Sequence, residues 1–134
     1  MGSDVIAQVR CAYPTGSLEN IERFYGQLLG LPQIGSFARH EGYAGIMFGL
    51  PDARVHLEFT QVEHEVALPQ WSVELLLVLY IPEKNAYAQL VAALQTAGVP
   101  RVLSENPYWE RGGSTFLDPD GRRVVIYNGA GLSS

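Results

Sequence analysis

The chain has 134 residues, of which 47% are hydrophobic and 17% charged, so it is long enough for one globular domain with a buried core. Its net charge of −5 excludes the basic face that nucleic-acid binding requires, and no apolar run approaches the ~18 residues that cross a bilayer. The beginning of the chain lacks the basic and apolar segments of an export signal, and a single cysteine excludes an intrachain disulfide. These features predict a cytoplasmic protein without a nucleic-acid or membrane partner.

The first half of the chain predicts a strand, a helix and three further strands. Residues 5–13 alternate loosely, as a strand does, and residues 18–29 repeat apolar side chains at helical spacing. Ser17 is a suitable N-cap for this helix, and Gly30 is a suitable residue to end it. The three further strands are predicted at residues 33–39, 44–50 and 54–61.

The second half predicts the same order of elements after a polar linker. A nearly continuous apolar run at residues 73–81 indicates a buried strand, and Pro82 suits the first turn of a helix that ends at Gly98. The loop at residues 104–112 is long, aromatic and polar. The last three strands are predicted at residues 99–103, 113–117 and 122–128.

The two halves match each other when Gly45 is placed on Gly113. Phe48 then meets Phe116 without a gap. The other matches are Gly30 with Gly98, Pro32 with Pro100, Pro51-Asp52 with Pro119-Asp120, and Arg54 with Arg122. A repeat of about half the chain length indicates a duplicated βαβββ module rather than an array of short repeats.

Several motifs of the chain resemble the vicinal oxygen chelate (VOC) superfamily of glyoxalases, bleomycin-resistance proteins and extradiol dioxygenases. They are SLENIERFY (residues 17–25) leading into LLGL (residues 28–31), the helix exit AGV (residues 97–99) and DPDG (residues 118–121) in the last hairpin. GLP (residues 49–51), HLEFT (residues 56–60) and NPYW (residues 106–109) are similar to a bacterial branch of that superfamily. Together the motifs cover almost the whole chain in the order expected for the superfamily.

The resemblance implies an α+β fold in which two tandem βαβββ modules form a curled mixed sheet around a cavity, and it implies a homodimer. It makes residues 1–134 a single VOC domain. The parts of this domain are module 1 at about residues 4–62, a linker at about 63–71, module 2 at about 72–128 and a tail at 129–134.

Metal-dependent members of the superfamily take one ligand from the first and fourth strands of each module. The resemblance places these positions on Arg10 (or Gln8 if the register moves by one pair), Glu58, Glu74 or Leu75, and Val125. A divalent ion needs several oxygen, nitrogen or sulfur ligands, and here one position is a cation and another a hydrocarbon. We therefore expect no cofactor, with a divalent metal as the alternative.

The fourth strand of the first module carries the candidate polar site. His56 and Glu58 are two residues apart, so both side chains point to the same face of the strand. The resemblance places this face on the cavity, where Arg10 would join them. The alternative is a purely structural ion pair of Arg10 with Glu58 beside a hydrogen-bonded His56.

Three aromatic residues are candidates for the mouth of the cavity: Tyr43, Tyr108 and Trp109. Loops on a rigid scaffold commonly carry binding residues, and Tyr and Trp combine a large ring with one polar group. The alternative for Tyr108 and Trp109 is packing as a lid or in a dimer interface.

These observations lead us to expect a metal-independent small-molecule-binding protein of the bleomycin-resistance type, which binds or sequesters an aromatic or amphipathic compound. The alternative is a glyoxalase-like lyase or isomerase, or a dioxygenase-related enzyme, with Glu58 as the candidate catalytic base. A guanidinium beside a carboxylate weakens it as a base, which favours binding. A third reading is an interaction module whose cavity is filled by its own side chains.

Overall fold

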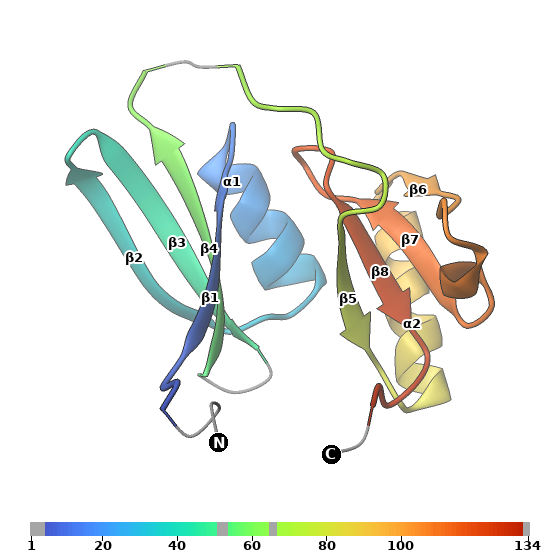
Figure 1. Ribbon diagram of the computed structural model, residues 1–134. Helices are drawn as coiled ribbons and strands as arrows, with labels where there is room; N and C mark the ends of the chain where they lie inside the picture. The colour runs from blue at the N-terminus through green and yellow to red at the C-terminus, as the bar shows by residue number, and fades with distance from the viewer. Residues whose placement is uncertain (1–4, 51–53, 65–66, 133–134) are drawn as a thin grey trace. The chain divides into compact units, whose positions relative to one another are not determined.

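The computed structural model describes residues 5–50, 54–64 and 67–132. The chain forms two compact units, Met1–Leu68 and Pro69–Ser134. Each unit contains a four-stranded sheet and a helix, in the order βαβββ (Figure 1). The predicted pair of tandem modules is therefore confirmed. No helix in the described part of the chain is long and apolar enough to cross a membrane.

The first unit contains a mixed sheet with its helix between the first two strands in sequence. Its elements are β1 (Val9–Pro14), α1 (Leu18–Ile21), η2 (Glu22–Leu28), β2 (Gln33–His40), β3 (Tyr43–Leu50) and β4 (Val55–Val62). The strand order is β1-β4-β3-β2. Strand β1 runs parallel to β4, whereas β3 is antiparallel to both β4 and β2, so β1 and β2 form the edges of this sheet.

The start of the first helix is fixed by hydrogen bonds from two sides. The Ser17 hydroxyl accepts the backbone N–H of Asn20 at 3.2 Å, which confirms the predicted N-cap. Gln61, on β4, accepts the backbone N–H of Leu18 at 3.1 Å and donates to the carbonyl of Gly16 at 3.0 Å. The helix is thereby attached to the strand that carries the candidate site.

The same helix differs from the prediction after Ile21. In η2 the hydrogen bonds follow the wider π-helical pattern, as when the backbone N–H of Leu29 reaches the carbonyl of Phe24 at 2.9 Å. The spacing of apolar residues could not predict the π-helical pattern, because a turn that contains one extra residue still directs apolar side chains towards the sheet. The helix ends at Gly30, whose φ of +74° favours glycine.

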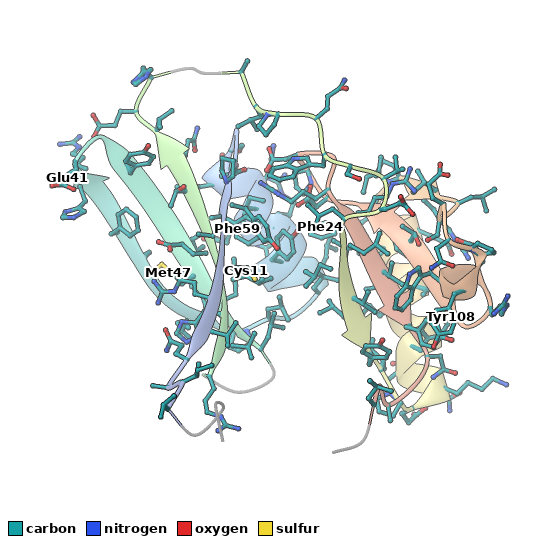
Figure 2. The ribbon with its side chains drawn as sticks, viewed as in Figure 1. Cys11, Phe24, Glu41, Met47, Phe59 and Tyr108 are labelled. Atoms are coloured by element: carbon teal, nitrogen blue, oxygen red, sulfur yellow. The ribbon has the colours of Figure 1, made fainter. Side chains whose placement is uncertain are left out.

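The core of the first unit lies between the helix and one face of the sheet. It consists of Ile21, Phe24 and Tyr25 from the helix, Ile46 and Phe48 from β3, and Leu57 and Phe59 from β4. The Tyr25 and Phe59 ring centroids are 4.6 Å apart, and Figure 2 shows Phe24 and Phe59 on the helix side of the sheet. Each such side chain stabilises the fold by roughly 1.5–3 kcal/mol through burial. The intervening residues of β4 therefore point to the opposite face, as predicted.

The second unit repeats this arrangement. Its elements are β5 (Leu76–Tyr80), α2 (Lys84–Thr96), β6 (Arg101–Val102), η3 (Pro107–Glu110), β7 (Gly113–Leu117) and β8 (Arg123–Tyr127). The strand order is β5-β8-β7-β6, with β5 parallel to β8 and β7 antiparallel to both β8 and β6. This is the topology of the first unit.

The helix of the second unit is α-helical throughout and ends as the repeat predicts. The Glu83 carboxylate accepts the backbone N–H of Asn85 at its start. Gly98 ends it with a φ of +79°, close to the value at the matching Gly30. The repeat therefore preserves these two glycines for the same backbone conformation.

Two predicted strands of the second unit are shorter in the structure. The apolar run at residues 73–81 gives only Leu76–Tyr80, because the backbone N–H of Leu75 bonds to the carbonyl of Ser72 in a turn. The strand predicted at residues 99–103 is reduced to Arg101–Val102. The backbone N–H of Val99 still bonds to Leu94 at the helix exit, which delays the start of this strand.

The core of the second unit lies between its sheet and α2. It includes Leu94 of α2 together with Phe116, Val124 and Ile126 of the sheet, all fully buried. The hydroxyl of Tyr87, on α2, lies 2.8 Å from the hydroxyl of Ser114, which pairs with Ile126. Ser114 and Ile126 therefore face the helix, and Val125 faces the other way.

The DPDG turn between β7 and β8 is closed by a buried ion-pair network. The Asp118 carboxylate accepts the backbone N–H groups of Asp120 at 2.8 Å and of Arg122 at 2.9 Å. The Arg122 guanidinium donates to Asp118 at 2.9 Å and to Asp120 at 3.1 Å. The guanidinium also lies 4.6 Å from the ring centroid of Trp71. This cation–π contact attaches the segment before β5 to the turn.

Candidate functional site

The open face of the first sheet, opposite the helix, carries the polar residues predicted from the sequence. In the parallel register of β1 and β4, Arg10 pairs with His56, and Ala12 pairs with Glu58. Thr60 follows on the same face of β4. The structure therefore brings three of the predicted site residues, Arg10, His56 and Glu58, onto neighbouring positions of two adjacent strands.

The side chain of Arg10 is held by three acceptors. Its Nη2 donates to His56 Nδ1 at 3.1 Å and to Gln8 Oε1 at 3.4 Å, while Nη1 lies 3.5 Å from Glu58 Oε1. The Arg10 side chain is 39% exposed, the Glu58 side chain 16%, and His56 as a whole 7%. The cluster is therefore a half-open site rather than a closed internal ion pair.

The contact with Arg10 sets the role of one ring nitrogen of His56. A guanidinium has only donors, so Nδ1 of the imidazole accepts in this contact. The imidazole thus serves as a support for the guanidinium in this arrangement.

The neighbouring strands give the cluster an apolar border. On β3 the same face holds Met47, which pairs with Glu58, and Gly45, which pairs with Thr60. A Cβ atom added to Gly45 would lie 2.5 Å from Cε1 of Phe37, so the Phe37 ring lies directly against this glycine. The charged groups therefore have apolar neighbours on the β2 and β3 side.

A pocket of about 510 Å³ lies on the same face, towards the carboxyl ends of β1 and β4. It is lined by Ala12, Tyr13, Pro14, Thr15, Tyr43, Thr60, Val62, His64 and Leu68. Tyr43 thus lies at the pocket, although at the other end of the face from Arg10. Ala12 both lines the pocket and pairs with Glu58, so the pocket begins beside the charged cluster.

The positions that the resemblance assigns to metal ligands do not fit a metal ion. Glu58 and Val125 occupy equivalent places, each between two residues that face a helix. Arg10 and Leu76 are equivalent as well, because they lie two residues before Ala12 and Val78, the strand partners of Glu58 and Val125. The first-strand ligand position of the second module therefore falls on Leu76 rather than on residue 74 or 75, because β5 begins later than expected. Of the four residues at the ligand positions, only Glu58 can bind a cation, and Arg10 repels one.

The described residues also contain no alternative metal centre. No group of three or more His, Cys, Asp or Glu side chains among them is placed to hold a metal ion. The polar cluster described above on the open face of the first sheet consists of a guanidinium, a carboxylate and an imidazole.

Tyr108, labelled in Figure 2, and Trp109 belong to the second unit, where both contact Tyr127 of β8. Tyr108 stacks on Tyr127, with ring centroids 5.9 Å apart, and Trp109 meets Tyr127 edge-on at 5.7 Å. Tyr80 of β5 packs against the other side of this cluster at 5.7 Å from Tyr127. Burial raises the pKa of the Tyr127 phenol, and its neighbours Tyr108 and Tyr80 raise it further, while Arg111 lowers it.

The sequence did not identify Tyr80 and Tyr127 as partners of Tyr108 and Trp109. Both belonged to apolar strand patterns, and their meeting depends on the register of β5 and β8, which pairs them. A sequence signal was nevertheless present. Three glycines, Gly112, Gly113 and Gly129, lie so close to Tyr127 that an added Cβ would come within 3.0, 2.9 and 3.2 Å of its ring.

Comparisons with known proteins agree on the fold. Residues 9–60 match the family model of the YycE-like N-terminal domain, and residues 74–128 match that of the YycE-like C-terminal domain. The protein YycE of Bacillus subtilis (strain 168) is 49% identical over 127 residues, which cover 95% of this chain and 91% of YycE. The crystal structure of a B. subtilis YycE protein of unknown function gives a TM-score of 0.91 at 48% identity, over 96% of this chain and 94% of that chain.

More distant structures share the fold alone. Glyoxalase I of Leishmania major gives a TM-score of 0.74 at 18% identity, over 91% of this chain and 86% of the enzyme. The antibiotic binding protein TnmS3 of Streptomyces sp. CB03234 gives 0.64 at 22% identity, over 94% of this chain and 98% of TnmS3. The same architecture thus serves both an enzyme and a binding protein.

Proposed function

The chain belongs to the YycE-like family of the vicinal oxygen chelate superfamily, and from this premise we propose that it binds a small anionic aromatic or amphipathic molecule without a metal ion. The binding site is the open face of the first sheet. The observation that carries the proposal is the Arg10 guanidinium, which is held in place by protein acceptors and is still 39% exposed. A fixed, accessible guanidinium is suited to recognise a carboxylate or another oxyanion.

The adjoining pocket supports a ligand with an apolar body. Its volume of about 510 Å³ lies within the roughly 300–1,000 Å³ of typical small-molecule sites. Its lining combines aliphatic side chains with Tyr43 and the hydroxyl groups of Thr15 and Thr60. An amphipathic molecule can therefore place its charge at Arg10 and its body in the pocket. That TnmS3 is an antibiotic binding protein with this fold is in keeping with binding as the function.

A second candidate function is a glyoxalase-like lyase or isomerase with Glu58 as general base. The observation that favours it is the single ion-pair partner of Glu58 among the described residues, which leaves carboxylate oxygen available for a proton. The neighbouring guanidinium opposes it by stabilising the charged carboxylate. Turnover of a bound compound would distinguish this candidate from simple binding.

The experiment is a calorimetric titration of the wild-type protein and Arg10→Met with 3-phenylpropionate, 3-phenylpropanol and 3-phenylpropylamine. We expect the anion to bind best, and Arg10→Met to weaken its binding about tenfold or more, because charge-assisted hydrogen bonds contribute about 1.5–3 kcal/mol. Dialysis against a metal chelator should leave the affinity unchanged.

The matched control is Arg23→Met, which removes another arginine that pairs with a glutamate, Glu19 at 3.4 Å, on the exposed side of the helix. This variant should bind the anion as the wild type does. Equal binding of all three compounds, or an affinity that survives Arg10→Met, would overturn the site. Loss of binding after chelation would overturn metal independence.

A further inference from the structure

The Arg10 guanidinium retains N–H groups that are not used within the described part of the chain. Of its five N–H groups, two on Nη2 go to His56 and Gln8, and one on Nη1 faces Glu58. The Nε–H and the second N–H of Nη1 have no acceptor among the described residues. Because the Arg10 side chain is 39% exposed, a bound carboxylate can accept from one of these two N–H groups.

The Glu58 carboxylate is also incompletely used. Its side chain is only 16% exposed, yet among the described residues its one partner is Arg10, at a distance of 3.5 Å. A carboxylate can accept about four hydrogen bonds, and largely buried acceptors are normally paired. A ligand that brings a hydrogen-bond donor to Glu58 would satisfy this group.

The surroundings let one ligand group reach both residues. Glu58 has two strand partners, Ala12 on β1 and Met47 on β3, and the end of the Met47 side chain lies against Gly35 of β2, where an added Cβ would be 3.0 Å from its methyl carbon. The small residue Ala12 is therefore the neighbour of Glu58 on the β1 side. Ala12 also lines the pocket. A head group placed at Arg10 and Glu58 is therefore continuous with a body that extends over Ala12.

From this geometry, and resting on the proposed function, we infer that the ligand head group combines a carboxylate with a hydrogen-bond donor on the adjacent carbon. The carboxylate binds Arg10, and the adjacent hydroxyl or ammonium donates to Glu58. The chemical class is an aromatic α-hydroxy or α-amino acid, whose ring lies over Ala12 at the near end of the pocket. A simple aromatic carboxylate lacks the donor and leaves Glu58 as it is in the free protein.

The test compares compounds that differ only in this donor. Wild-type protein is titrated with 3-phenyllactate, with phenylalanine and with 3-phenylpropionate, which share the ring and the carboxylate. We expect 3-phenyllactate or phenylalanine, or both, to bind about tenfold tighter than 3-phenylpropionate, since a hydrogen bond to a charged acceptor has an effect of this size. The comparison of 3-phenyllactate with phenylalanine shows whether a hydroxyl or an ammonium group is the preferred hydrogen-bond donor.

Two variants locate the effect. Glu58→Met keeps the length of the side chain and removes both acceptor oxygens. The ratio of the affinity for the tighter-binding donor compound to the affinity for 3-phenylpropionate should therefore fall to about one. Glu19→Met makes the same change in an exposed arginine–glutamate pair on α1, and it should keep the preference. The ratio of affinities within each variant is compared, so a general change in affinity does not affect the result.

The outcomes separate the two proposals. If 3-phenylpropionate binds through Arg10 but neither donor compound binds tighter, this inference is overturned and the proposed function stands. If the preference survives in Glu58→Met, the donor does not meet Glu58 and the inference is likewise overturned. If no compound binds, or all bind equally well to Arg10→Met, both proposals are overturned.

Discussion

The ion pair of Arg10 and Glu58 is open to water on one side, which limits what it contributes to folding. Its shortest N–O distance is 3.5 Å, and the arginine side chain is 39% exposed. Exposed pairs stabilise by roughly 0–1 kcal/mol, whereas breaking a fully buried pair costs about 3–5 kcal/mol. The geometry therefore predicts that this pair contributes little to the free energy of unfolding.

We predict that Glu58→Gln lowers the free energy of unfolding by about 1 kcal/mol or less, because Arg10 keeps His56, Gln8 and water as partners. For a chain of this length the melting temperature should fall by about 2–5 °C. Differential scanning calorimetry of the ligand-free protein measures the change. Glu19→Gln, in the exposed pair with Arg23, is the control and should change it less. A loss above about 3 kcal/mol would mean that Glu58 is buried with its partner.

The face on which a site residue lies could be predicted where the pattern of a single strand determines it. His56 and Glu58 share a face because strands alternate, and this needed no knowledge of the other strands. Their meeting with Arg10 depended on the register of β1 and β4, which the family resemblance supplied. The partnership of Tyr127 with Tyr108 could not be predicted, because it depends on how the loop before β7 folds back onto β8.

At the scale of elements, the matching glycines Gly45 and Gly113 show why the repeat keeps a glycine in the third strand. A Cβ at Gly45 would come within 2.5 Å of Phe37, and one at Gly113 within 2.6 Å of the carbonyl oxygen of Trp109 and 2.9 Å of Tyr127. In both units an aromatic ring therefore occupies the space of the missing side chain. The sequence showed the match, and the structure supplies its steric reason.

We predict that Gly113→Ala destabilises the protein by about 1–3 kcal/mol, because the added methyl group meets backbone as well as a ring. Gly26→Ala is the control, since its Cβ would be 3.4 Å from Phe48, an ordinary contact. In a helix this change should be neutral or stabilising by up to about 1 kcal/mol. Urea-induced unfolding measures both. Equal stabilities of Gly113→Ala and the wild type would show that the loop before β7 adjusts freely.

Other features of the elements were beyond the sequence. The π-helical geometry of η2 and the shortness of β6 both depend on hydrogen bonds that compete at the ends of elements, such as Leu29 to Phe24 and Val99 to Leu94. Side-chain periodicity does not report on these bonds. Apart from η3, which lies in a segment predicted as a loop, the existence and order of the elements were predictable, because most of them have an apolar pattern and a glycine or proline at a boundary.

At the scale of the whole chain, the two units share a topology and differ on the sheet face opposite the helix. Where the first unit has Arg10 and Glu58, the second has Leu76 and Val125. The helix-facing core residues are apolar in both units, apart from Ser114, which bonds to Tyr87. The two copies of the module are thus more alike on the face that packs against the helix than on the opposite face.

We predict that the protein is a homodimer in solution. Strands β1 and β5 are sheet edges, and apolar side chains at or near them remain exposed, including Val9 at 50%, Leu75 at 54% and Tyr80 at 43%. Exposed apolar groups at unpaired strand edges favour association. Light scattering at micromolar concentration should give twice the chain mass, and Leu75→Glu should lower it. A wild-type mass equal to that of one chain would contradict this prediction.

The placement of Trp71 and Trp109 has a consequence for optical spectroscopy. They are the chain's two tryptophans, and both belong to the second unit, one against the Arg122 guanidinium and the other against Tyr108 and Tyr127. Indole fluorescence during unfolding therefore follows the second unit, whereas far-ultraviolet circular dichroism sums the backbone of both. Coincident curves from the two signals would show that the duplicated halves unfold as one cooperative body, and separated curves would show that each half keeps its own transition.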